Sequence, residues 1–137
     1  MVSLRKNYRL LLADDDPGFR ETLRLIFEPH FSLLEAASGE EAIEISGRSR
    51  VDIALLDMHM QTMTGLETLK IFKTIHAAAP CILITADASE ELQRTATAAD
   101  AYSVLHKPVS RLELVTTVST ALVDVYDDPE AFSEFPD

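Results

Sequence analysis

Residues 11–16 read LLADDD, an apolar run that leads directly into Asp14, Asp15 and Asp16. Adjacent carboxylates repel one another, so the fold must supply a positive partner close to them. An apolar run that ends in acids and is followed by Pro17 is typical of a buried strand, a turn and the first turn of a helix. This stretch therefore predicts a strand–helix unit that carries acidic side chains at the end of its strand.

The same unit recurs along the chain. Apolar runs predict five strands at residues 8–13, 31–36, 51–57, 81–85 and 102–107, and the third and fourth are continuous enough to be buried on both faces. A segment with helical spacing follows each run, and Asp16 and Ser38 are the expected N-caps of the first two helices. Five strands alternating with five helices predict an α/β fold, a doubly wound parallel sheet of the flavodoxin-like type.

Apolar spacing also predicts which helical residues face the sheet. The fourth helix offers mainly Leu92 and alanines, so we expect it to be the least firmly anchored. The other inward-facing residues expected are Phe19, Leu23, Ile26 and Phe27 in the first helix, Leu66, Leu69, Phe72 and Ile75 in the third, and Leu112, Val115, Val118, Leu122 and Val125 in the fifth.

Length, charge and cysteine content limit the class of protein. A chain of 137 residues, 47% of them hydrophobic, suits one compact domain. The net charge of −11 argues against nucleic-acid binding, which needs a basic patch. Cys81 is the only cysteine and lies in an apolar run, as expected of a packed thiol. The first apolar run is too short for a signal peptide or a membrane span, so we expect a cytoplasmic protein.

Polar residues follow four of the predicted strands. These are Asp14 and Asp15 after the first strand, Asp57 after the third, Thr85 after the fourth and Lys107 after the fifth. Because parallel strands present their carboxyl ends at one edge of the sheet, we expect these five side chains to converge.

This set of side chains has a definite chemistry. Clustered carboxylates with room for water suit a hard divalent ion such as Mg²⁺, whose open positions are typically filled by phosphate oxygens. Lys107 and Thr85 supply a cation and a hydroxyl to the same phosphoryl group. Asp57 is then the expected nucleophile, because a carboxylate can form an aspartyl-phosphate once its surroundings are neutralised.

From about residue 8 to residue 125 the chain resembles the response-regulator receiver domain of two-component signalling. The resemblance is carried by LLADDDP, by LLDMHMQTMTGLE around Asp57, by ILITA around Thr85 and by HKP at Lys107. It implies sheet order 2-1-3-4-5, a cis Lys107–Pro108 bond and phosphorylation of Asp57 by a histidine kinase or histidine phosphotransfer protein. It also implies Mg²⁺ bound by Asp15, Asp57 and the backbone carbonyl of His59, with Asp14 assisting.

The chain departs from the usual receiver pattern at three positions. Gln61 stands where a proline is usual four residues after the phosphoacceptor, and Asp100 replaces a glycine before the fifth strand. Val104 replaces the aromatic residue whose rotation reports phosphorylation in many relatives. With Val104 too small for that role, we expect the signal to pass through residues 86–99 to a surface shared with the fifth strand and fifth helix.

Two further side chains are expected at the rim of the site. His59 could be read as a metal ligand or a relay histidine, but the acids already provide an oxygen site, and we favour a rim position. His59 and Asp87 occupy positions that in the family influence how fast the aspartyl-phosphate hydrolyses. No enzyme activity is expected beyond slow self-dephosphorylation.

Other functions remain open at this stage. A flavodoxin-type cofactor site would need hydroxyl and glycine donors where the three aspartates stand. A phosphatase of the haloacid dehalogenase type would need an aspartate where His59 stands. A pseudo-receiver that docks partners without phosphorylation is the third alternative.

The regions beyond the receiver give fewer clues. Residues 1–125 form the predicted receiver, and residues 126–137 form an acidic tail or the start of a linker. The cognate kinase, the downstream protein target and a homodimer formed on activation are expectations that no motif identifies.

Overall fold

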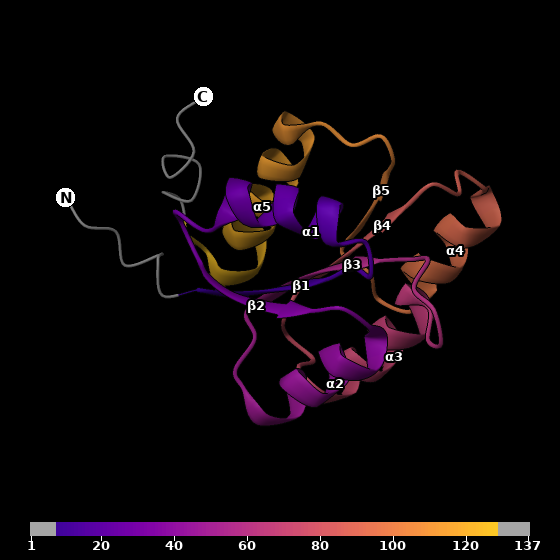
Figure 1. Cartoon of the computed structure of the whole chain (residues 1–137), viewed down its shortest axis with the longest axis horizontal. Helices are drawn as coiled ribbons and strands as arrows, with labels where there is room; N and C mark the ends of the chain where they lie inside the picture. The colour runs from indigo at the N-terminus through magenta and orange to yellow at the C-terminus, as the bar shows by residue number, and fades with distance from the viewer. Residues whose placement is uncertain (1–7, 129–137) are drawn as a thin grey trace.

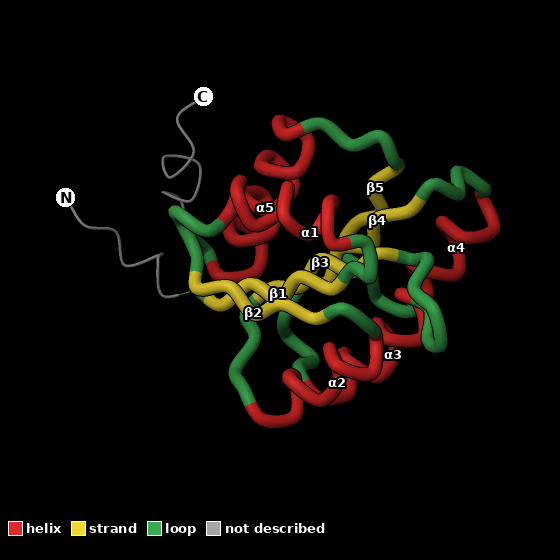
Figure 2. The backbone as a smooth tube through the Cα atoms, viewed as in Figure 1, coloured by secondary structure: helices red, strands yellow, loops and turns green. Residues whose placement is uncertain are grey.

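The computed structural model describes residues 8–128. Strands and helices alternate throughout this range (Figures 1 and 2). The strands are β1 (Arg9–Ala13), β2 (Ser32–Ala36), β3 (Ile53–Asp57), β4 (Cys81–Thr85) and β5 (Ser103–His106). The helices are α1 (Pro17–Phe27), α2 (Gly39–Arg48), α3 (Gly65–Ile75), α4 (Glu90–Ala98) and α5 (Arg111–Tyr126). All five predicted strands are therefore confirmed, within two residues at each end.

The five strands form one sheet in the order β2-β1-β3-β4-β5, and every pairing is parallel. This confirms both the fold class and the strand order expected from the resemblance. Figure 1 shows α1 and α5 on one face of the sheet and α2, α3 and α4 on the other. Every residue of β3 and of β4 is buried, as the continuous apolar runs predicted.

Side chains alternate between the two faces along each strand, so the core has two parts. Leu10, Leu12 and Ile53 belong to the cluster beneath α1 and α5. Leu11 and Ala54 belong to the cluster beneath α2, α3 and α4. The period of two in the strands therefore supplies both helical layers with an apolar surface.

Each helix begins at a short polar residue whose side chain accepts a backbone N–H. Asp16 and Ser38 cap α1 and α2 as predicted, and Thr64, Ser89 and Ser110 cap the remaining three. Thr64 also forms a capping box with Glu67, which fixes the start of α3 directly after the loop that follows β3.

Part of the predicted helical pattern is wrong. Leu112 was expected to face the sheet, but 74% of it is exposed, and Ile75 and Val125 are exposed as well. In α5 the other three expected residues, Val115, Val118 and Leu122, are buried as predicted, and its buried face also contains Leu114, Ser119 and Ala121. The fourth helix does bury only two residues, Leu92 and Ala96, as expected of a weakly anchored element.

Gly65 has no room for a side chain. A Cβ atom there would lie 2.3 Å from the carbonyl oxygen of Asp57. The backbone of Gly65 therefore packs directly against the end of β3. We expect Gly65→Ala to lower the free energy of unfolding by about 1–3 kcal/mol. The control is Gly47→Ala in α2, where an added Cβ atom would have nothing within 4 Å. This substitution should raise the free energy of unfolding by about 0.5–1 kcal/mol, because alanine favours a helix more than glycine does. Urea unfolding checks both, and equal effects would contradict this account of the loop.

Candidate functional site

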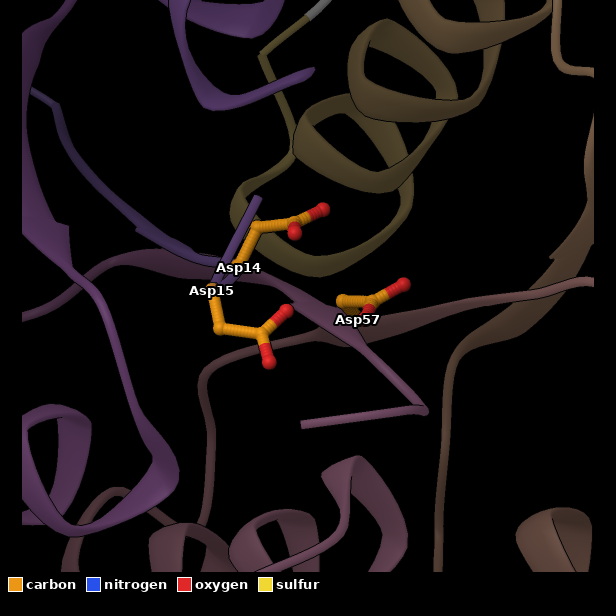
Figure 3. Close-up of side chains that lie close together, drawn as sticks. All are labelled: Asp14, Asp15 and Asp57. Atoms are coloured by element: carbon orange, nitrogen blue, oxygen red, sulfur yellow. The ribbon is translucent and has the colours of Figure 1, made fainter. Parts of the chain in front are cut away.

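Three carboxylates meet at the carboxyl edge of the sheet (Figure 3). Asp14 and Asp15 follow β1, and Asp57 is the last residue of β3. One oxygen from each of the three lies within 4.8 Å of the others. Asp14 and Asp57 are buried, and Asp15 is more accessible. Asp16 does not join them, because its side chain accepts the N–H of Gly18 and caps α1.

Lys107 supplies the positive charge that the acids require. Its Nζ lies 2.8 Å from Oδ1 of Asp57 and 3.9 Å from Oδ2 of Asp14. Burial alone would lower the pKa of Lys107, but the hydrogen bond and charge of Asp57, together with the charges of Asp14 and Asp16, raise that pKa above its ordinary value. Lys107 therefore remains a cation beside the acids.

The surroundings of Asp14 disfavour its ionised form. Burial, the largest cause, raises its pKa to about 6, and the charge of Asp57 acts in the same direction. The N–H of Asp16, 2.8 Å from Oδ1 of Asp14, opposes that shift. Oδ2 of Asp14 is buried and has no hydrogen-bond partner among the described residues. An orphaned carboxylate oxygen beside two further acids fits a divalent cation that prefers oxygen ligands.

Thr85 lies at the end of β4 and is fully buried. Its Oγ1 accepts the backbone N–H of Asp87 at 2.9 Å, which links the strand end to the loop before α4. The backbone N–H of Lys107 donates to the carbonyl of Thr85 at 2.7 Å. The structure thus places Thr85 and Lys107 on adjacent strand ends, on the edge where Asp57 lies.

His59 and Asp87, the two side chains expected at the rim of the site, are exposed. The backbone N–H of Ser89, 2.9 Å from Oδ1 of Asp87, is the main cause that holds the pKa of Asp87 below its ordinary value. The charges of His59 and His106 add to that effect. The roles of His59 and Asp87 in hydrolysis stay predictions, as does the metal contact of the His59 carbonyl.

The three departures from the receiver pattern have different outcomes. Asp100 adopts a φ of 73°, so it does occupy the left-handed region, which aspartate tolerates better than most residues. Val104 is partly buried against the cluster beneath α2, α3 and α4. Tyr102 packs on the opposite cluster and its OH donates to Asp124 at 2.6 Å, so it does not replace the missing aromatic. Gln61 is exposed in the loop after β3.

Sequence reasoning missed two residues beside the site, both in the first turns of α1. Arg20 donates from a guanidinium nitrogen to the carbonyl of Asp14 at 2.6 Å and pairs with Glu35 at 3.5 Å. The Phe19 ring lies under the ammonium of Lys107, with 4.6 Å between Nζ and the ring centroid. Their position in the first turn of α1, directly after the acids, is the sequence feature that could have indicated their closeness to the site.

Comparison with known proteins identifies the class. Residues 10–119 match the model of the response regulator receiver domain, and the chain belongs to that family of signalling domains. It is 30% identical over 115 residues to the chemotaxis protein CheY of Halobacterium salinarum, covering 83% of this chain and 96% of that protein.

Some relatives are much longer than this chain. The chain is 32% identical over 118 residues to the transcriptional regulatory protein GlrR of Escherichia coli, covering 85% of this chain but only 27% of GlrR. Among solved structures, it is similar to one chain of the CheX–CheY complex with BeF3 and Mg²⁺ from Borrelia burgdorferi. That similarity has a TM-score of 0.78 at 28% identity and covers 85% of this chain and 90% of the other.

The cis Lys107–Pro108 bond implied by the resemblance is present. No helix among residues 8–128 is long and apolar enough to cross a membrane.

Proposed function

We propose that this chain is the phosphoacceptor of a two-component phosphorelay and that Asp57 receives the phosphoryl group. The observation that carries the proposal is the Asp57 carboxylate, buried at a strand end, 2.8 Å from the ammonium of Lys107 and grouped with two further acids. Such a carboxylate can attack phosphorus only if the negative charge around it is offset.

The residues fit a bound Mg²⁺. Asp14, Asp15, Asp57 and the carbonyl of His59 would hold it, and the ion would shield the acids from the incoming phosphoryl oxygens. Lys107 and Thr85 would bind oxygens of the attached group. Support comes from the similarity to the Borrelia burgdorferi CheX–CheY complex, which holds BeF3 and Mg²⁺. Slow hydrolysis of the aspartyl-phosphate, tuned by His59 and Asp87, completes the cycle.

The donor in this proposal is a histidine kinase or histidine phosphotransfer protein, and the receiver is residues 1–125. The cytoplasmic location expected from the sequence is retained. The tail at residues 126–137 lies mostly outside the described residues and stays a prediction. A flavodoxin-like cofactor binder and a haloacid dehalogenase-type phosphatase lose their support because the chain belongs to the receiver family.

The direct test is incubation with acetyl phosphate and intact-mass measurement. We expect one added phosphoryl group when Mg²⁺ is present and none when the divalent cation is chelated. Failure to incorporate phosphate with Mg²⁺ present would favour a pseudo-receiver, which docks its partner without modification.

The proposed output is movement of residues 86–99 toward the surface formed by α4, β5 and α5. Thr85 supports this route, because its hydroxyl holds the N–H of Asp87 and cannot turn toward Asp57 without disturbing that bond. Leu92 and Ala96 are the only residues that α4 buries, so its displacement costs little apolar contact. Self-association of the activated form belongs to the same proposal.

Hydrogen exchange with and without beryllium fluoride and Mg²⁺ tests this output. We expect changed protection in residues 86–99 and unchanged protection in α2, which serves as the internal control. Constant protection in residues 86–99 together with a change on the α2 face would show that the signal takes another route.

A further inference from the structure

The ring of Phe19 contacts the ammonium of Lys107. The function proposed above assigns no role to Phe19. It is the third residue of α1 and is partly buried against the cluster beneath α1 and α5. Its ring centroid lies 4.6 Å from Nζ of Lys107. The Lys107 side chain is 30% exposed, so water still reaches part of it.

Within residues 8–128, three groups contact the ammonium of Lys107. Two are the carboxylates of Asp57 and Asp14, at 2.8 and 3.9 Å. The third is the face of the Phe19 ring, whose negative quadrupole attracts a cation at this distance.

The two kinds of contact respond differently to a divalent cation. A cation bound by Asp14 and Asp57 offsets their charge, so their attraction for Lys107 weakens. The ring is uncharged and binds no metal, so its attraction for the ammonium persists. Phe19 then becomes the contact that keeps Lys107 turned toward Asp57.

We infer that Phe19 is a positioning residue that holds the Lys107 ammonium in place for the phosphoryl group on Asp57. The inference rests on the function proposed above. Phe19 touches no reacting atom in this scheme and acts through Lys107 alone. A lysine that is already oriented loses less side-chain freedom when it binds the phosphoryl oxygens, and this raises affinity.

The test compares Phe19→Leu, which keeps an apolar side chain and removes the quadrupole, with Phe19→Tyr, which keeps the ring. Isothermal titration calorimetry measures the affinity for beryllium fluoride in the presence of Mg²⁺. We expect Phe19→Leu to weaken binding by about two- to fivefold and Phe19→Tyr to bind as the unaltered chain does. Equal affinity of the unaltered chain and Phe19→Leu would overturn the inference.

A spectroscopic measurement separates positioning from a general structural role. The ring should shift the ε-methylene proton resonances of Lys107 upfield, with and without Mg²⁺, in the unaltered chain and in Phe19→Tyr but not in Phe19→Leu. A double-mutant cycle on unfolding free energy with Lys107→Met should show that Phe19→Leu costs less once the ammonium is gone. Equal costs in both backgrounds, or no upfield shift with the ring present, would overturn the inference.

Asp57→Asn distinguishes failure of the inference from failure of the proposed function. If this variant binds beryllium fluoride as well as the unaltered chain, the function assigned to Asp57 is wrong. If Asp57→Asn abolishes binding while Phe19→Leu leaves it intact, only the role of Phe19 is wrong.

Discussion

Asp57→Asn is expected to abolish phosphorylation completely. The Asp57 side chain ends a fully buried strand, is itself 4% exposed, and has Lys107 at 2.8 Å from Oδ1. An amide of the same shape keeps the packing but cannot form the acyl-phosphate bond, because the attacking group is a carboxylate oxygen. Intact-mass measurement after treatment with acetyl phosphate and Mg²⁺ should show no added phosphoryl group.

The matched control for this variant is Asp16→Asn. Asp16 follows the same strand as the acids of the site but is exposed and caps α1, a role that asparagine fills equally well. Its phosphorylation should match that of the unaltered chain. If Asp57→Asn still incorporates phosphate while circular dichroism shows an intact fold, another residue is the phosphoacceptor.

The sequence predicted the sheet well because its strands are short, apolar and ended by polar residues. Asp57 and Thr85 mark the ends of β3 and β4 to the residue. Once five strand–helix units were recognised, right-handed parallel connections left little freedom in where those ends could lie. Convergence of the five site residues on one edge follows from that topology.

The helix faces were less predictable, and α5 shows why. It is apolar on several sides, and its buried face combines Val115, Val118 and Leu122 of the predicted stripe with Leu114 and Ala121 beside it. The two ends of the predicted stripe, Leu112 in the first turn and Val125 in the last, remain exposed. Periodicity identifies a helix reliably, but with such a sequence only tertiary packing selects the buried side.

The contacts of Arg20 and Phe19 could not be predicted for a different reason. Each joins α1 to a group that reaches it only through the fold: the carbonyl of Asp14 for Arg20 and the ammonium of Lys107, 88 residues away in sequence numbering, for Phe19. Spacing along a single chain places strand ends, but it does not show which distant groups a side chain will contact. The sequence predicted Mg²⁺ and Lys107 as the positive partners of the acids. It could not predict that the ammonium of Lys107 lies 2.8 Å from the carboxylate of Asp57.

Asp14→Asn is expected to make the metal-free protein more stable at pH 7. Burial raises the pKa of Asp14 from 3.8 to about 6, so the folded state binds the proton more tightly than the unfolded state does. The favourable contribution of that proton is complete below pH 3.8 and is lost as the pH rises through 6. Asparagine carries no charge and still accepts the N–H of Asp16, so we expect a gain of about 1–3 kcal/mol at pH 7.

Unfolding by urea over a pH series, with chelator and then with Mg²⁺, measures this gain. The advantage of Asp14→Asn should shrink below pH 6 and vanish near pH 4, where Asp14 is itself neutral. Mg²⁺ should reverse the order at pH 7, because the ion stabilises the unaltered chain by binding its folded state and the variant has lost one of the acids. Asp16→Asn should show neither effect. A loss of stability in metal-free Asp14→Asn at pH 7 would mean that the ionised carboxylate is already well compensated by Lys107, and that the acids do not need the metal to relieve their repulsion.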